Sequence, residues 1–230
     1  MADLAQFQQI IGVTFNNPGL LDLALTHSSY INENPGMAPV SNERLEFLGD
    51  SALGLIIAEK LYCDYPAATE GDLTRLRSAL VRQEMLAHVA QNINLGSYLH
   101  LGRGEESGGG RQKTANLSGA FEALVAAIYL DAGFEVVRHF VLELFEPEIH
   151  AQARLGAGND FKSRLQEIVQ AERQITPSYH LIKAVGPDHA KEFTVEVKIG
   201  NTTLGRGTGN SKKTAEIEAA RRALESLSES

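Results

Sequence analysis

The sequence predicts an all-α domain followed by a small α+β domain with the element order α-β-β-β-α. Before residue 153, apolar residues recur mainly at helical spacing and few runs of β-branched residues occur. The stretch Leu155-Gly156-Ala157-Gly158-Asn159 has the composition of a flexible connection. After it, three strand-like runs lie between two helical patterns. These observations place the first domain at 1–153, a linker at 154–159 and the second domain at 160–230.

The first domain contains two strongly apolar helices that carry isolated acidic residues. The earlier one begins in the segment Asn42–Ser51 and continues through Ala52–Ala58, and the later one covers Leu117–Leu130. Between them, the glycine-rich segment Gly102–Gly110 is predicted to be a loop. Its glycine pattern is more typical of a mobile connector than of a phosphate-binding loop. A last helical pattern spans Val136–Ala153.

The second domain is predicted to begin with a helix from Phe161 to about Ala171, which Asp160 caps. Runs rich in β-branched and aromatic residues predict three strands, at Tyr179–Ala184, Glu192–Ile199 and Thr202–Arg206. A closing helix covers Ser211–Leu227 and starts with Ser-Lys-Lys. Amides at a helix N-terminus together with two lysines suit phosphate binding. A solvated basic helix start is the simpler interpretation of these lysines, but it leaves the accompanying strands unexplained.

Acidic side chains in the two apolar helices predict a metal site. Glu46 and Asp50 lie four residues apart, and therefore on one helix face, which Glu43 begins one turn earlier. If the helices pack together, Glu122 of the second helix joins them in one pocket, where a cation would offset repulsion and lost hydration. Oxygen ligands without His or Cys favour Mg²⁺ or Mn²⁺ over zinc. The alternative is that each acid caps a helix or lies in solvent.

The formal net charge of -8 argues superficially against a nucleic-acid partner, which normally needs a basic surface. The acid is concentrated in the first domain, however. Residues 160–230 carry 11 Lys and Arg against 10 Asp and Glu, whereas residues 1–159 carry 10 against 19. Binding of a nucleic acid would therefore depend on local basic clusters rather than on the net charge.

Cysteine usage and the N-terminus bear on the compartment. Cys63 is the single cysteine, so no intramolecular disulfide is expected and a reducing compartment is favoured. A lone thiol is more typical of packing than of a nucleophile. The first residues lack the charged and apolar regions of a signal peptide, and the apolar run after Ser51 ends at Glu59-Lys60. We therefore expect a soluble, cytoplasmic protein that makes no membrane contact.

The segment NERLEFLGDS closely resembles the signature of the bacterial ribonuclease III family, and FEALVAAIYLD resembles the second acidic helix of its nuclease domain. Further likenesses occur in Leu25–Tyr30, Glu70–Arg77 and Leu101–Glu106, so the resemblance runs in order along most of the chain. The second domain, with GNSKKTA before its last helix, resembles a double-stranded-RNA-binding domain. The resemblance implies an endoribonuclease (a hydrolase) that cuts double-stranded RNA to 5′-phosphate and 3′-hydroxyl ends with a short 3′ overhang, in rRNA and mRNA processing and decay.

The resemblance also implies roles for individual residues of the nuclease domain. Asp50 and Glu122 would be catalytic, and with Glu46 they would bind Mg²⁺, which Mn²⁺ can replace. A divalent cation at such a site activates water and stabilises charge on the phosphate and the leaving 3′ oxygen. His27 lies in an apolar-patterned segment, which favours a structural hydrogen-bonding role over acid or base chemistry. Accessory roles near a cleft between subunits would fall to Glu43, Glu70 and Asp72.

RNA binding and dimerisation follow from the same resemblance. A staggered cut needs two active sites related by two-fold symmetry, which a C2 homodimer supplies. Phe47 would then insert into the partner subunit, although it is equally suited to the core of the monomer. The second domain would read the shape of the duplex across two minor grooves and the phosphates between them. The residues expected to contact RNA are Ser163, Gln166, Glu167, Gln170, His189, Lys212 and Lys213.

Gly119 is the one departure from the family pattern, which has an Asp three residues before the Glu of the second acidic helix. A glycine offers no side chain to a metal, but Mg²⁺ ordinarily keeps several waters and needs few carboxylates. We therefore expect a working enzyme that requires more metal. The alternative function is a regulator that binds double-stranded RNA and cleaves it weakly or not at all. A third possibility, an acidic helical scaffold, would leave the lysines of the last helix unexplained.

Overall fold

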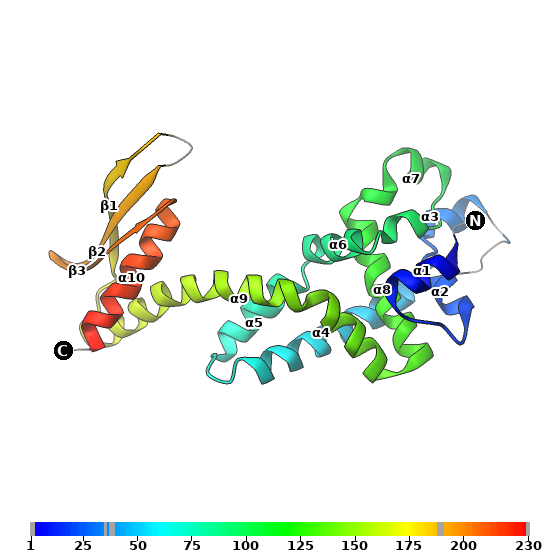
Figure 1. The fold of residues 1–230 in the computed structure, drawn as a ribbon, viewed down its shortest axis with the longest axis horizontal. Coiled ribbons are helices and arrows are strands. Elements are labelled where there is room, and N and C mark those ends of the chain that lie inside the picture. Colours follow the sequence, from blue (N-terminus) through cyan, green and yellow to red (C-terminus); the bar gives the residue numbers. More distant parts are fainter. Residues whose placement is uncertain (1–2, 35, 37–39, 188–190, 229–230) are drawn as a thin grey trace. The chain divides into compact units, whose positions relative to one another are not determined.

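The computed structural model describes residues 3–34, 36, 40–187 and 191–228. The chain divides into two compact units between Gln152 and Ala153. The first is a bundle of helices and the second is a three-stranded sheet with helices against it (Figure 1). In the described part of the chain, no helix is both long enough and apolar enough to cross a membrane.

The first unit is helical throughout, as the spacing of its apolar residues predicts. Thr69 and Asp72 form a capping box at the start of α5, and Pro18 stands in the first turn of α2. Its elements are α1 (Leu4–Ile11), α2 (Pro18–Ala24), α3 (Ser28–Glu33), α4 (Glu43–Asp64), α5 (Glu70–Leu80), α6 (Gln83–Asn92), η1 (Leu95–Tyr98), α7 (Arg103–Ser107), η2 (Gly110–Gln112), α8 (Thr114–Ala132) and the first part of α9.

Helix α8 forms the centre of this unit. Its residues from Leu117 to Ile128 are buried except for Glu122, because α4, α6 and α2 pack around it. A helix that is apolar on all sides must be covered on all sides, and this accounts for the nearly unbroken apolar sequence. Glu122 is therefore the one acidic side chain in the most buried stretch of the domain.

The glycine-rich segment at 102–110 differs from the predicted loop. It contains the short helix α7 and the beginning of η2. Glu33 of α3 accepts hydrogen bonds from the amides of Arg103 (2.8 Å) and Gly104 (3.2 Å), at the first turn of α7. This long-range cap satisfies amides that a five-residue helix leaves unpaired, and local sequence rules do not foresee it.

Helix α9 (Phe134–Arg173) also differs from the prediction. Its backbone is helical through residues 154–159, where the sequence predicts a flexible connection. Each glycine costs about 1 kcal/mol in a helix interior, but helix growth from both flanks offsets a short unfavourable stretch. The helix predicted from Phe161 is therefore the last part of a longer one.

The second unit has the predicted α-β-β-β-α order. Strands β1 (Ser178–Val185), β2 (Glu192–Ile199) and β3 (Thr202–Gly209) form an antiparallel sheet in the order β1-β2-β3, and α10 (Lys212–Ser228) follows. Strands β1 and β3 extend one to three residues beyond the predicted ends. Alternate residues of β2 pack against the helices in one small core, formed by Leu165, Val169, Val195, Val197, Ile199, Ala215, Ala219, Ala220 and Ala223.

Small residues set the distance between β3 and α10. A Cβ atom on Gly207 would lie 2.2 Å from the amide nitrogen of Ala219, and one on Gly205 would lie 2.5 Å from its carbonyl oxygen. Only glycine on the strand and alanine on the helix permit this close approach. The start of α10, with its two lysines, is thereby held against the sheet.

Candidate functional site

The predicted acidic pocket forms where α4 packs against α8. Gly49 of α4 faces Glu122, and a Cβ atom at Gly49 would lie 1.8 Å from the carbonyl oxygen of Glu122. No other residue permits two helix backbones to come so close. Because Glu46 and Asp50 flank Gly49 in the sequence, this contact brings both carboxylates beside Glu122.

The electrostatics of the pocket show that the three carboxylates are near one another. Burial is the main cause that raises the pKa of Glu122 to about 7, and the charges of Asp50 and Glu46 raise it further. Burial and then the charge of Glu43 raise the pKa of Glu46, while His27 lowers it. Asp50 is exposed at the edge of the pocket. The pocket therefore concentrates negative charge that no basic side chain fully neutralises.

The donor atoms of this pocket suit a hard divalent cation, since all of them are carboxylate oxygens. In their present positions, however, no three His, Cys, Asp or Glu side chains of the described residues surround a point at which an ion would be held. Three mutually repelling carboxylates have no reason to converge without a cation between them. Side-chain rotation would have to complete the site.

Gly119 lies directly beneath the carboxylate of Glu46. A Cβ atom at Gly119 would be 2.8 Å from Oε2 of Glu46 and 3.0 Å from its Cδ. The carboxylate of Glu46 thus occupies the space that a side chain at position 119 would take. The sequence predicts that position 119 lacks a carboxylate, but it does not predict that the carboxylate of Glu46 lies in that space.

A buried asparagine anchors the first turn of α4. The side-chain Nδ2 of Asn42 donates to the carbonyl oxygen of Ala24 (3.0 Å), and its amide donates to the carbonyl oxygen of Thr26 (2.9 Å). The amide of His27 in turn donates to the carbonyl oxygen of His100 (3.1 Å). The sequence analysis gave Asn42 no role, although its place at the head of the acidic motif is a signal that could have revealed one.

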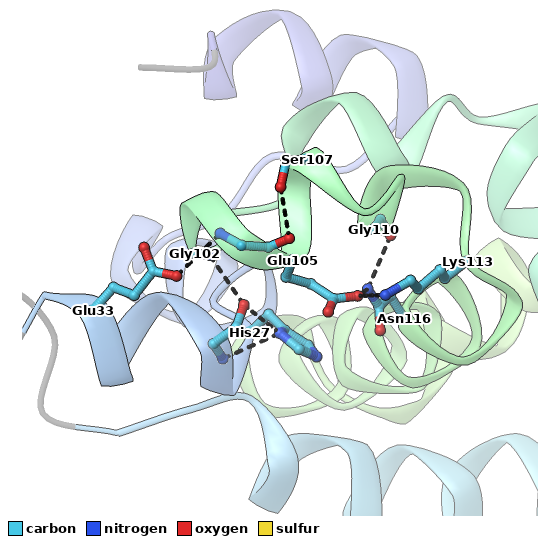
Figure 2. Close-up of polar contacts among 10 residues, drawn as sticks. His27, Glu33, Gly102, Glu105, Ser107, Gly110, Lys113 and Asn116 are labelled. Atoms are coloured by element: carbon cyan, nitrogen blue, oxygen red, sulfur yellow. Dashed lines mark hydrogen bonds and ion pairs between the residues drawn. The ribbon is translucent and has the colours of Figure 1, made fainter.

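A second polar cluster lies at the start of α8, beside His27 (Figure 2). Oε1 of Glu105 accepts hydrogen bonds from Nζ of Lys113 (2.7 Å) and from Nδ2 of Asn116 (2.8 Å). The hydrogen bond from Lys113 is the main cause that lowers the pKa of the Glu105 carboxyl. Asn116 also donates to the carbonyl oxygen of Gly110 (2.9 Å), so this cluster fixes the loop that leads into α8.

The last residue of the second acidic motif has a structural role that sequence reasoning missed. The carboxylate of Asp131 accepts hydrogen bonds from the backbone amides of Asn16 (2.7 Å) and Asn17 (2.8 Å). Asn17 in turn caps α2. Asp131 therefore ties the end of α8 to the start of α2 across the domain.

The predicted accessory residues have identifiable local partners. Glu43 accepts a hydrogen bond from Ser41 (2.7 Å) and lies near Glu46. Glu70 accepts one from Thr74 (2.9 Å). Asp72 belongs to the capping box of α5 and pairs with Arg75, which is a structural function. Of the three, only Glu43 acts on the charge of the acidic pocket.

The predicted RNA-binding residues lie on two helices of the second unit. The side chains of Ser163, Gln166, Glu167 and Gln170 are exposed on α9, and Lys212 and Lys213 are exposed in the first turn of α10. Ser211 precedes that turn, and its Oγ accepts a hydrogen bond from the amide of Thr214 (3.1 Å), as an N-cap does. His189 lies outside the described residues.

Comparison with known proteins yields matches for both units. Residues 17–149 match a family described as ribonuclease-III-like, and residues 161–227 match the double-stranded RNA binding motif. The chain is 51% identical over 230 residues to a protein named ribonuclease 3 from Dehalococcoides mccartyi, covering 100% of this chain and 97% of that one. It is 51% identical over 219 residues to ribonuclease 3 from Roseiflexus sp., covering 94% and 92%.

The first unit also resembles a solved structure, the nuclease domain of ribonuclease III from Campylobacter jejuni, which is described as flexible in a region involved in dimer formation. That likeness has a TM-score of 0.59 and 39% sequence identity, and it covers 63% of this chain and 97% of that one.

Proposed function

Because this chain belongs to the ribonuclease III family, we propose that it cleaves double-stranded RNA with divalent cations bound by Glu46, Asp50 and Glu122. The family is that of an endoribonuclease, and the second unit is a double-stranded-RNA-binding domain. One observation carries the proposal. A pocket of three carboxylates, built by the contact of α4 with α8, occurs in the same chain as a domain for duplex RNA.

The charge of the pocket supports a metal cofactor. The raised pKa values of Glu122 and Glu46 reflect negative charge that burial makes costly, and a cation would offset that cost. Mg²⁺ is favoured because every donor is an oxygen, and Mn²⁺ would substitute. When bound, the cation supplies an activated water and stabilises charge on the phosphate. Glu46, Asp50 and Glu122 would hold it, and the proposed reaction needs no covalent protein nucleophile.

The products and the setting follow from membership of the family. Attack by water would leave 5′-phosphate and 3′-hydroxyl ends, and two cuts across the duplex would leave a short 3′ overhang. The natural substrates would be rRNA precursors and mRNA in the cytoplasm. A regulator that binds RNA without cleaving it, the alternative that Gly119 suggested, gains no support from the relatives, which are named ribonuclease 3.

The second unit would recognise the shape of the RNA duplex rather than its sequence. Four exposed side chains on α9 would reach the 2′-hydroxyls and base edges of one minor groove: Ser163, Gln166, Glu167 and Gln170. Lys212 and Lys213 would bind phosphates, supported by the amides of the first turn of α10. His189 is proposed, from the sequence alone, to enter the next minor groove.

A homodimer would supply the second active site, and α4 presents a surface suited to it. Phe47 is 79% exposed, Leu55 59% and Tyr62 73%, and all three lie within one face of the helix. Gly54 lies on the same face with no atom within 4 Å of its Cβ position. Three large apolar side chains exposed on one face of a helix indicate an interface.

The spacing of this face favours an antiparallel pair of α4 helices. A two-fold axis beside Gly54 and Leu55 would place Phe47 opposite Tyr62 of the partner subunit, because the two positions are equally far from the axis. Each subunit has a cavity of about 280 Å³ there, lined by Tyr62, Cys63, Tyr65, Pro66, Ala68 and Leu73. Phe47 would fill it, as an interface residue rather than part of the monomer core.

The test of the proposal is cleavage of a long, perfectly paired RNA across titrations of Mg²⁺ and Mn²⁺. We expect the parent protein to cut and Glu122→Gln to be inactive at every metal concentration. A parent protein that binds the duplex and never cuts it would contradict the proposal. Gly119→Asp, tested alongside, should lower the metal concentration for half-maximal cleavage about tenfold, because a fourth carboxylate worth about 1.4 kcal/mol is added.

A further inference from the structure

We propose that His27 donates a hydrogen bond from Nε2 to a phosphate oxygen of the bound RNA strand, at the edge of the acidic pocket. This inference rests on the proposed function, and it assigns a role in substrate positioning to a residue for which the sequence favours only a structural one.

The contacts of Nδ1 determine the tautomer of His27. The amide of Ser29 donates to Nδ1 (3.2 Å), so Nδ1 carries no proton. The hydroxyl of Ser29 lies 2.8 Å from the same nitrogen and accepts a hydrogen bond from the amide of Gly102 (3.0 Å). The hydroxyl proton is therefore free to point at Nδ1. With Nδ1 an acceptor, the ring proton is on Nε2.

The Nε2 proton has no acceptor among the described residues, although the ring is half-buried. The nearest charged groups come from two elements. His27 acts to lower the pKa of both Glu46 of α4 and Glu105 of α7, so the ring lies near both carboxylates, and Figure 2 shows it beside Glu105. Nε2 is not among the buried side-chain atoms that lack a partner, so water meets this donor in the free protein and a ligand oxygen can replace that water.

Neither neighbouring carboxylate is positioned to be that acceptor. Glu46 leans toward Gly119, and Oε1 of Glu105 is occupied by Lys113 and Asn116. The Nε2 donor is therefore available to an oxygen that arrives with the substrate. RNA phosphates are the anionic oxygens that the proposed reaction brings to this pocket, and a ring N–H group can bind one without competing for the metal.

Rigid backbone contacts fix the position of His27 relative to the pocket. The amide of His27 donates a hydrogen bond to the carbonyl oxygen of His100. Asn42, which begins the turn that carries Glu46, donates hydrogen bonds to the carbonyl oxygens of Thr26 and Ala24. A donor that is held in place before the substrate arrives loses little entropy when it binds. This arrangement is expected of a residue that positions substrate.

Two substitutions of His27 test the roles of its two ring nitrogens separately. In His27→Asn, Oδ1 replaces Nδ1 as the cap of α3 and the Nε2 donor is lost, whereas in His27→Gln an amide N–H reaches toward the position of Nε2. We expect His27→Asn to fold, to bind duplex RNA without metal as the parent does, and to cleave about 10- to 100-fold more slowly. His27→Gln should recover most of that loss.

An NMR experiment gives a readout that does not depend on cleavage. Histidine-selective ¹⁵N labelling of the Glu122→Gln protein, with His27→Asn added to assign the signal, should show the Nε2–H tautomer. The Nε2 proton should shift downfield when duplex RNA is added without metal. Parent-like cleavage by His27→Asn, or an Nδ1–H tautomer, would overturn the inference. Cleavage by Glu122→Gln would instead overturn the proposed function.

Discussion

A carboxylate half-buried beside two others, as Glu122 is, keeps its proton at pH values where a solvated glutamate has lost it. Its pKa of about 7 follows from burial first, and from Asp50 and Glu46 second. Proton and metal therefore compete for the same oxygens. The pH of the solution therefore decides whether Glu122 is ionised and able to bind a cation.

For the metal-free protein we predict a loss of stability as the pH rises from about 4.5 to about 7. The unfolded chain ionises Glu122 near 4.5, whereas the folded chain holds the proton up to about 7, so the native state binds more protons in this range. The measurement is chemical denaturation in EDTA at pH 5 and pH 8. Added Mg²⁺ should stabilise the protein more at pH 8 than at pH 5.

Glu122→Gln is the matched control, since it keeps the shape of the side chain and removes its titration. The difference in stability between pH 5 and pH 8 should be smaller in this variant than in the parent. Equal differences in the two proteins would show that Glu122 does not carry the proton that the buried pocket implies.

Contacts between elements decide whether the pocket exists at all. Helices α4 and α8 meet at Gly49, and the same device recurs where β3 meets α10 at Gly205 and Gly207. In each case a missing side chain allows two backbones to approach, and the functional groups beside the contact are positioned by it.

Gly49→Ala should destabilise the protein by about 1–3 kcal/mol, although alanine is the better helix former. The added Cβ would lie 1.8 Å from the carbonyl oxygen of Glu122 and must force the helices apart. Urea denaturation measures the cost. Gly71→Ala is the control, because its Cβ would make only an ordinary contact, at 3.8 Å from Thr69. Equal stability of the two variants would contradict the close contact.

The two lysines in the first turn of α10 are expected to bind phosphates of the duplex. Replacing Lys212 and Lys213 with glutamine should weaken binding to duplex RNA and reduce the slope of log affinity against log salt by about 1 for each phosphate that is no longer neutralised. Filter binding over a range of salt concentrations measures both effects. Lys198→Gln is the control, because Lys198 pairs with Glu196 on the sheet (3.2 Å). A slope that the double substitution leaves unchanged would exclude these lysines from the interface.

For the whole molecule, the proposed staggered cut depends on a dimer. Phe47→Asp should convert the protein to a monomer, because a charge cannot enter the cavity beside Tyr62 of the partner subunit without losing its hydration. Sedimentation velocity measures the molecular mass. Leu130→Asp places the same charge on an apolar residue that is 51% exposed on α8, outside this face, and should leave the dimer intact. A dimeric Phe47→Asp protein would contradict the interface.

The fold class of both domains and the family could be predicted from the sequence alone. Periodicity predicted an all-α first domain and the α-β-β-β-α order of the second, because burial requires apolar residues at the spacing of each element. It did not predict α7 or the helical backbone at 154–159. The spacing of Glu46 and Asp50 placed two carboxylates on one face of α4. The resemblance to the family followed from short motifs that occur in the family's order along the chain, and the comparisons confirmed it.

Only the tertiary structure decided how these parts meet. The approach at Gly49, the displaced carboxylate of Glu46 over Gly119 and the cap that Glu33 provides to α7 all join residues far apart in the chain. The same is true of the hydrogen bond from the amide of Gly102 to the hydroxyl of Ser29, which contacts Nδ1 of His27. Local propensity carries no information on such contacts, since their energies depend on which backbones pack together. The sequence supplies the ligands and donors, and packing alone determines where each one points.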